Sequence, residues 1–445
     1  MSYSVNIQSV ICCNIKTYAM NTRFTLAAAL LLASAASFSA SAQRDNRHME
    51  KGVTTTLHND TASQDDVERH MKENAPNAPN DNGLPRFAIV GRDHEFYLGI
   101  GMQFLGEGVF TWGDAMPSAY DFVPAAMTHP TPGNGGSTQF AWQTSSVYLN
   151  FVAMPKNENK IGIFFKANFT GDGNSFHCSH LYAKYRRLTL GRTNSLFTDG
   201  AAQPMTIDDQ GPNGYPSITL FTAYWEQRLY KNLTGAIGID APTASMTTGS
   251  STSTVNQRIP SIPLYLQYAW DGGDSHVRLS GIVRPLQYRN LAEGSNSTLV
   301  GGGIQISGMT KVVGELQANF NAAYGRGIGS YLQDDSGLGM DAVASNETGK
   351  MTTMETFGIT GGLSYAFSPK LSTNLVYSHL LNGRPDNAAV ESDKYRYGDY
   401  VAANVIYSFN RFVSAGIEYD YGHRKTFAGE SLHANRLQCQ LAVTF

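Results

Sequence analysis

The sequence predicts an all-β fold, a transmembrane antiparallel β-barrel of about 16 strands with a short polar N-terminal extension. Three observations favour this fold. Apolar and polar residues alternate at period two in runs of about ten residues, the length that a tilted strand needs to cross a bilayer. The composition is rich in Gly (44), Tyr (23) and Phe (22), and only 16% of the residues are charged. After the first 42 residues, no apolar run reaches the ~18–20 residues of a membrane helix.

Residues 1–42 are predicted to be an upstream extension followed by a cleaved signal peptide, with Met20 as the true start. Arg23 supplies a positive n-region, residues 24–38 are apolar or small, and residues 40–42 (ASA) form an A-x-A cleavage site. The apolar run is short and is followed by small residues, which is typical of a secretion signal rather than a membrane helix. The chain is therefore expected to be exported.

The charge balance and the cysteines exclude some classes of function. Removing Lys16 and Arg23 from the 33 basic residues leaves 31 against 36 acidic ones, a net charge near −5. That balance does not support nucleic-acid binding. Cys178 and Cys439 remain after the leader, and two cysteines do not make a disulfide framework. The sequence leaves open whether they are bonded, and a buried or lipid-facing role is expected for Cys439.

Residues 43–86 are predicted to be a polar periplasmic linker, largely disordered. They are rich in polar residues and contain the stretch NAPNAPNDNG, which offers nothing to a packed core. From residue 87 the alternating pattern begins and continues to residue 445. This second part is predicted to be the barrel.

Alternation along the barrel region is clearest in six runs. In the last of them, residues 436–445 (RLQCQLAVTF), the apolar face ends on Phe445 and Arg436 lies on the polar face. A strand of a soluble sandwich is the alternative for any single run. The pattern persists over roughly 350 residues without a linker, and this persistence favours one closed barrel over several soluble domains. The other runs are residues 96–105, 161–170, 277–284, 357–367 and 413–422.

The connections between these runs fall into two classes of length. Short turns are expected at residues 231–232, 271–274, 368–370 and 410–411. Long polar loops, rich in Gly or Ser, are expected at residues 120–137, 244–255, 334–350 and 382–393. Short turns alternating with long loops are typical of outer-membrane barrels, whose long loops lie outside the cell.

Six segments of the barrel region together carry a resemblance to a known family: residues 191–199 (GRTNSLFTD), 208–212 (DDQGP), 258–260 (RIP), 323–331 (AYGRGIGSY), 416–424 (GIEYDYGHR) and 435–438 (NRLQ). These segments resemble the DcaP-like porins of the outer membrane. The likeness covers about residues 83–445 and depends on the order and spacing of its motifs rather than on any single one. The chain departs from the family at Asn194, near which a tryptophan is absent, and at residues 143–146 (QTSS), where arginine is usual. The resemblance implies a trimeric barrel of about sixteen strands that passes small anionic solutes, dicarboxylates among them.

A passive channel needs a constriction and a charge bias inside the pore rather than catalytic residues. Residues 193–215 are the candidate constriction loop, whose acidic side would comprise Asp199, Asp208 and Asp209. Arginines on opposing walls can hold a carboxylate in bidentate fashion. Alternatively, these charges solvate the lumen and pair with Glu418 and Asp420 to brace the wall. The candidate basic side comprises Lys166, Lys184, Arg192, Arg278, Arg284, Arg424 and Arg436, and the resemblance slightly favours Arg284 and Arg436.

Other chemistry has little support in the sequence. Strict alternation would put Cys178 and His180 on one face and His177 on the other, which leaves too few aligned ligands for a metal. Adjacent carboxylates at residues 208–209 could serve an outer-membrane protease, but such pairs in loops usually face solvent or bind arginine. No G-x-S-x-G, Walker or H-E-x-x-H motif is present. No metal site and no cofactor are predicted.

The sequence therefore predicts a non-enzymatic porin of a Gram-negative outer membrane. Its expected partners are outer-membrane lipid and lipopolysaccharide, two further copies in a homotrimer, small anionic solutes, and the barrel-assembly machinery through the strand that ends at Phe445. Two alternatives stay open at this point. One is an outer-membrane barrel enzyme of the protease or lipase type, and the other is a secreted soluble β protein that binds glycans.

Overall fold

The structure is a computed structural model that describes Met71, Asn74 and residues 87–91, 95–133, 135–154 and 159–445. The predicted leader and most of the predicted linker lie outside these residues. These described residues belong to one compact unit. In the described part of the chain, no helix has the length and apolar character to cross a membrane.

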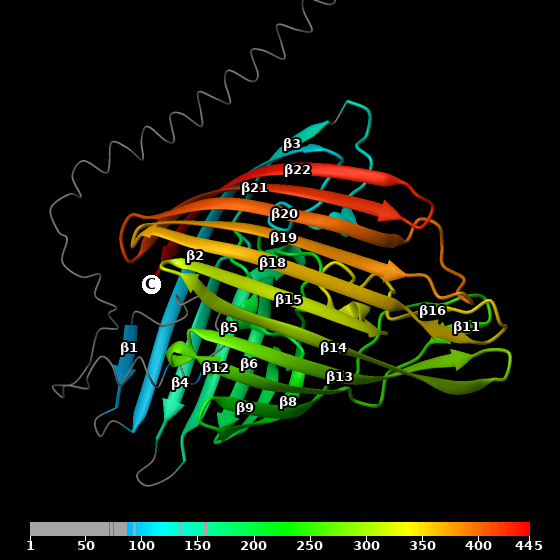
Figure 1. The fold of residues 1–445 in the computed structure, drawn as a ribbon, viewed down its shortest axis with the longest axis horizontal. Helices are drawn as coiled ribbons and strands as arrows, with labels where there is room; N and C mark the ends of the chain where they lie inside the picture. Colours follow the sequence, from blue (N-terminus) through cyan, green and yellow to red (C-terminus); the bar gives the residue numbers. More distant parts are fainter. Residues whose placement is uncertain (1–70, 72–73, 75–86, 92–94, 134, 155–158) are drawn as a thin grey trace, which may run out of the picture. The chain divides into compact units, whose positions relative to one another are not determined.

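Sixteen strands join into a closed antiparallel ring, which confirms the predicted fold class. The order around the ring is β2, β4 to β9, β12 to β15 and β18 to β22, and the short strands β10 and β11 are not members of it. Closure occurs at β2, which pairs with β4 over residues 96–103 and with β22 over residues 103–113. Figure 1 shows β13 to β15 and β18 to β22 side by side as one wall of tilted strands.

The strands of the ring and the shorter elements have the following bounds. The ring consists of β2 (Phe96–Gly113), β4 (Ser146–Ala153), β5 (Ile161–Gly171), β6 (Ser175–Tyr185), β7 (Leu188–Asn194), β8 (Thr219–Tyr230), β9 (Leu233–Asp240), β12 (Ile262–Trp270), β13 (Ser275–Asn290), β14 (Ser295–Val313), β15 (Leu316–Arg326), β18 (Glu355–Ser368), β19 (Leu371–Gly383), β20 (Tyr395–Ser408), β21 (Val413–Thr426) and β22 (Ser431–Thr444). The shorter strands are β1 (Phe87–Val90), β3 (Gly136–Ala141), β10 (Met246–Thr247), β11 (Thr252–Thr254), β16 (Ala342–Ala344) and β17 (Met351–Thr353). The 3₁₀ turns are η2 (Pro124–Ala126), η3 (Asp172–Asn174), η4 (Gly200–Ala202), η5 (Asp271–Gly273) and η6 (Gly329–Tyr331).

The two faces of the wall have opposite polarity. On β14, Ile304 and Ile306 point outward with 62% and 47% of their surface exposed, whereas Gln305 and Ser307 point inward and are fully buried. Successive side chains of a strand alternate between faces, so every second residue belongs to one environment. A soluble β protein would bury the isoleucines. The six alternating runs of the sequence all lie in ring strands, with their apolar faces outward.

The predicted short turns and the predicted long loops lie at opposite ends of the barrel. The predicted short turns at residues 231–232, 271–274, 368–370 and 410–411 all lie at one end, here called the turn end. The long connections all lie at the other, here called the loop end. Because the strands are antiparallel, each turn and the loop that follows it must lie at opposite ends.

Three long connections fold back inside the ring and build its core. They are called the first inner loop (residues 114–133), the second inner loop (195–218) and the third inner loop (327–354). Each contains one 3₁₀ turn: η2, η4 and η6 respectively. One apolar cluster joins all three loops to the inside of the wall, and it contains Ala125, Phe197, Leu220, Ile282, Ile328, Tyr331, Leu332, Leu380 and Tyr395.

Near the turn end, two residues that precede β1 pack against the inside of the wall. Met71 and Asn74 both have helical backbone and are buried. The Asn74 amide donates to Asn150 Oδ1 at 2.6 Å, and the Asn150 amide donates to the Met71 carbonyl at 2.9 Å. The Tyr182 hydroxyl donates to the Asn74 carbonyl at 3.0 Å. A Cβ at Gly162 would lie 1.6 Å from Asn74 Oδ1, so this contact requires glycine there.

Candidate functional site

The second inner loop, the predicted constriction loop, is anchored to the wall through carboxylates. Glu418 on β21 accepts hydrogen bonds from the backbone N–H groups of Ile207 and Asp208 at 2.8 and 2.7 Å. Asp208 in turn accepts from the Phe122 N–H at 2.7 Å and from the Tyr400 hydroxyl at 3.1 Å. Burial, together with neighbouring carboxylates, raises the pKa of Asp208 well above its usual range. Asp208 is therefore a buried anchor rather than a group that lines the pore.

Asp199 is a second buried anchor of the same loop. Its carboxylate is fully buried and accepts from His276 Nε2 at 2.9 Å and from the Ser307 hydroxyl at 2.7 Å. An Arg278 guanidinium nitrogen lies 3.8 Å away. Burial alone would raise the pKa of Asp199, but the Arg278 charge and the His276 hydrogen bond hold that pKa below its usual range. These contacts tie the start of the loop to β13 and β14.

Asp209 differs from both anchors because its side chain is exposed. Its backbone N–H donates to the Tyr120 carbonyl at 3.2 Å, which joins the first and second inner loops. Its carboxylate lies near enough to the half-buried Lys166 on the inward face of β5 for their charges to attract. Asp121 in the first inner loop adds a second carboxylate beside Asp209. Lys166 and Asp209 are here called the constriction pair.

Arg284 and Arg436, the two predicted pore arginines that the resemblance favoured, are fully buried. Arg284 forms a bidentate ion pair with Asp341 of the third inner loop, with N···O distances of 2.7 and 3.2 Å. Arg436 donates to the Ser118 carbonyl of the first inner loop at 2.5 Å and to Thr111 Oγ1 at 3.2 Å. Both arginines hold inner loops against the wall, which favours the bracing interpretation over contact with solute.

Three further basic candidates point inward with different surroundings. Arg278 is held by Asp199 and lies over the Tyr265 ring at 4.1 Å from its centroid. Arg424 donates to the Met127 carbonyl of the first inner loop at 2.6 Å. Lys184 is half-buried near the turn end, where it pairs in register with inward-facing residues of β5 and β7. Arg278 and Arg424 therefore also brace loops.

Arg192 faces outward, which corrects its predicted place on the lumen wall. It pairs in register with Leu181 and Phe221, whose side chains are 49% and 57% exposed on the outward face. Directly paired residues share a face of a sheet. Arg192 follows Leu188 and Leu190 at period two, so the local alternation already placed it with the outward leucines. The prediction gave more weight to the charge of Arg192 than to its position in the alternating pattern.

The predicted arrangement of residues 177–180 is also wrong, because a β-bulge interrupts β6. Lys166 pairs with His180, but the next residue of β5, Ala167, pairs with Cys178, so Ser179 is extra. A bulge of one residue reverses the face of everything beyond it. Cys178 and His180 therefore lie on opposite faces. Among the described residues, no group of three His, Cys, Asp or Glu side chains could hold a metal ion.

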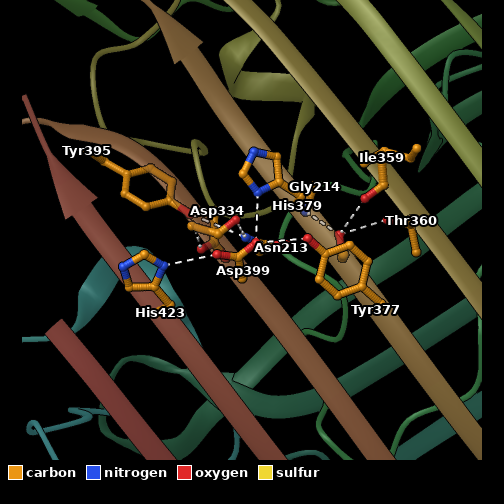
Figure 2. Close-up of polar contacts among 12 residues, drawn as sticks. Asn213, Gly214, Asp334, Ile359, Thr360, Tyr377, His379, Tyr395, Asp399 and His423 are labelled. Carbon is orange, nitrogen blue, oxygen red and sulfur yellow. Dashed lines mark hydrogen bonds and ion pairs between the residues drawn. The ribbon is translucent and has the colours of Figure 1, made fainter. Parts of the chain in front are cut away.

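Asp334, which joins all three inner loops, was not among the predicted site residues. It belongs to the third loop and accepts from the Ala125 N–H of the first loop at 3.0 Å and from the Gln210 amide of the second at 2.8 Å. Figure 2 shows it beside Tyr395 of β20, whose hydroxyl donates to it at 3.3 Å. Burial raises the pKa of Asp334 to about 7. Only its place in a long polar loop was visible in the sequence.

Comparisons with known proteins place the fold among outer-membrane channels. No family model matches the sequence, and no curated protein sequence matches it. The outer membrane channel DcaP of Acinetobacter baumannii is similar in structure, with a TM-score of 0.69 and 19% identity over 80% of this chain and 99% of that chain. OprB of Pseudomonas putida is similar with a TM-score of 0.50 and 8% identity over 78% of this chain and 94% of that chain. The expected resemblance to DcaP-like porins is confirmed for the fold.

Proposed function

We propose that this chain is a porin that forms a water-filled channel in a Gram-negative outer membrane, for small anionic solutes of the dicarboxylate class. The observation that carries the proposal is a closed ring, apolar outside and polar inside, with the constriction pair within it. A closed barrel leaves no unpaired strand edge, which is the condition for strands to lie in hydrocarbon.

The outward aromatic residues support a membrane location. At the turn end, Tyr185, Trp225 and Tyr268 are each close to half exposed on the outward face. Toward the loop end, Tyr324 of β15 is 44% exposed on the same face. Aromatic side chains at both ends of an apolar band are typical of the two membrane interfaces of an outer-membrane barrel.

The preference for anions is supported by which charges stay accessible. Lys166 is half-buried on the lumen wall, whereas most other inward cations are held in loop contacts. On the acidic side, burial and the nearby Asp209 carboxylate raise the pKa of Asp121 to about 7, which lowers its average negative charge near neutral pH. A cation opposite a weakened acidic side favours carboxylate solutes at the constriction.

An enzyme built on the acidic pair of residues 208–209 has less support. Asp208 is 2% exposed, and its oxygens are occupied by the Phe122 N–H and the Tyr400 hydroxyl. A general base must reach the proton that it removes.

The proposal also includes export by a cleaved signal peptide, a homotrimer, contact with outer-membrane lipid and lipopolysaccharide, and recognition of the strand ending at Phe445 by the barrel-assembly machinery.

Single-channel recording in planar bilayers tests the proposal. The purified full chain should insert as stable conductance steps that succinate reduces more strongly than a neutral sugar of similar size. The folded barrel should also resist SDS until boiled and then change its mobility. Absence of channels from protein that passes the mobility test would contradict the porin function. Unchanged mobility on boiling would contradict the membrane barrel.

The selectivity of the channel should depend on pH through Asp121. The raised pKa of about 7 means that its carboxyl is negative above neutral pH and uncharged below it. Lowering the pH from 8 to 6 removes this negative charge, so the reversal potential in a KCl gradient should shift toward anions. Asp121→Asn should show the acidic-pH value at both pH values. An equal shift in that variant would assign the effect to another group.

A further inference from the structure

A cavity of about 590 Å³ lies at the rim of the turn end, between the connection from β4 to β5, the turn from β6 to β7, and β8. Its size is within the range of pockets that hold a small ligand or a headgroup. The described residues that line it are three cations, one amide and one tryptophan, and they include no carboxylate. It is here called the basic cavity. Its lining consists of Asn159, Lys160, Arg186, Arg187 and Trp225.

The two arginines of the basic cavity form the whole turn between β6 and β7. Tyr185 and Leu188 are direct partners, so only Arg186 and Arg187 connect them. Arg186 has a φ of 57°, in the left-handed region where Gly or Asn is favoured over other residues. The backbone of this turn would therefore be at least as stable without an arginine at position 186. The turn geometry does not explain the residue, which directs attention to its side chain.

Both guanidinium groups are available to a ligand. Arg186 and Arg187 are exposed, and neither side chain makes a hydrogen bond or an ion pair within the part of the chain that the structure describes. The Arg186 guanidinium lies 5.9 Å from the Tyr185 ring centroid, a contact that uses none of its N–H groups. Arg284 and Arg436, in contrast, are held by inner loops. A guanidinium is charged at any physiological pH and presents five N–H donors.

The basic cavity borders the apolar outer surface of the barrel. Trp225 is 46% exposed on the outward face, and its direct partner there is Leu188. Leu188 in turn pairs with Tyr185, and Tyr185 pairs with Ile161. Direct partners share a face, so these four side chains form a straight row across β5 to β8, here called the rim row. Lys160 and the two arginines follow the row directly on its turn side.

The rim row indicates the depth of the basic cavity in the membrane. The long loops of an outer-membrane barrel lie outside the cell, so in the proposed orientation the turn end faces the periplasm. Trp and Tyr side chains mark the level of the headgroups. The cations just beyond Tyr185 and Trp225 therefore lie at the level of the lipid phosphates of the periplasmic leaflet, where Lys and Arg attract anionic lipids.

We propose that the basic cavity binds the phosphate of an anionic phospholipid of the periplasmic leaflet, with the acyl chains lying along the rim row. The inference rests on the proposed outer-membrane location. Planar guanidinium groups match a phosphate with paired charge-assisted hydrogen bonds. An acidic peptide of the periplasm would also meet these cations, but it would leave Leu188 and Trp225 without an apolar partner. The combination of cations with an apolar row favours the lipid.

The test measures lipid retention by the full chain, purified in detergent in its native oligomeric state. The probes are phosphatidylglycerol and phosphatidylethanolamine with the same acyl chains, offered in equal amounts, and native mass spectrometry reads which lipid stays bound. Phosphatidylglycerol should be retained about tenfold more than phosphatidylethanolamine, because only the former carries a net negative charge to the cations. Equimolar glycerol phosphate, the same headgroup without acyl chains, should not displace it.

The informative variant is the double substitution Arg186→Asn/Arg187→Gln. Asparagine tolerates the left-handed backbone of position 186, so the turn should be kept while both charges are lost. The preference for phosphatidylglycerol should then fall below about threefold. Lys370→Gln/Arg411→Gln is the matched control, because it removes two cations from other turns of the same end that do not line the cavity, and it should keep the full preference. SDS resistance before boiling confirms that each variant is folded.

Four results would overturn the inference. They are equal retention of the two lipids by the unaltered chain, an undiminished preference in the double variant, displacement of the lipid by equimolar glycerol phosphate, and its displacement by an equimolar acidic peptide of peptidoglycan. Conductance separates this inference from the proposed function. Normal channels in a protein without lipid preference would remove the lipid site alone, whereas absence of channels would contradict the porin function.

Discussion

Replacing Arg284 with alanine is expected to lower the free energy of unfolding by about 3–5 kcal/mol, because it leaves a buried carboxylate without its cation. Arg284 and Asp341 are both fully buried, and their bidentate contact joins the wall to the third inner loop over 57 residues of sequence. The guanidinium also lies over the Tyr331 ring at 4.6 Å from its centroid. Besides the Arg284 ion pair, the Asp341 carboxylate accepts hydrogen bonds from the backbone N–H groups of Ser245 and Ser330.

Unfolding by urea in detergent micelles, followed by tryptophan fluorescence, measures this effect. The matched control is Arg326→Ala, which removes an exposed ion pair with Glu355 at 3.2 Å and should cost less than about 1 kcal/mol. A loss for Arg284→Ala no larger than for the control would contradict the bracing role. Single-channel noise should rise in Arg284→Ala, because the third inner loop loses its attachment to the wall.

Reversing the charge of Lys166 is expected to change the anion-to-cation permeability ratio by about tenfold toward cations, because accessible charge in a narrow pore sets the local ion concentration. Lys166 is half-buried on the lumen wall and its charge is near that of the exposed Asp209. Asp209→Asn should therefore shift the ratio in the opposite direction. The reversal potential in a KCl gradient measures both shifts.

Arg192→Glu is the matched control for this experiment, because it reverses a charge of the same sign that lies on the outward face. It should leave the reversal potential unchanged. A shift as large as that of Lys166→Glu would contradict the outward placement of Arg192. Lys166→Gln gives a milder change, which should shift the ratio in the same direction by less if Lys166→Glu impairs folding.

Alternation that persists over roughly 350 residues was enough to predict the barrel and the polarity of its two faces. Alternation at period two assigns each residue of a regular strand to a face, and it placed Arg436 inward and Leu437 outward before any contact was known. Loop length likewise separated the turn end from the loop end. These are local properties, so they can be read without knowing what each strand contacts.

Alternation was not enough at the bulge in β6. One extra residue at Ser179 reversed the faces of Cys178 and His180, and a bulge has no strong sequence signal there. The predicted lumen position of Arg192 was wrong for a different reason. The alternation of the sequence already placed this residue on the outward face, but its charge was given more weight. The cross-strand row of His379, Asp399, His423 and His433 was not predicted either, because its four members come from four strands and meet only through strand register.

Which charges stay accessible was decided by the tertiary structure alone. The sequence determined that Arg284 and Arg436 point inward, but inner loops that fold back from distant parts of the chain bury both of them. A buried charge persists only where a partner compensates for its lost hydration. That partner is set by the path of a loop rather than by the residues next to the arginine. The side that a residue faces is thus a local property of the chain, whereas the group that it meets there is not.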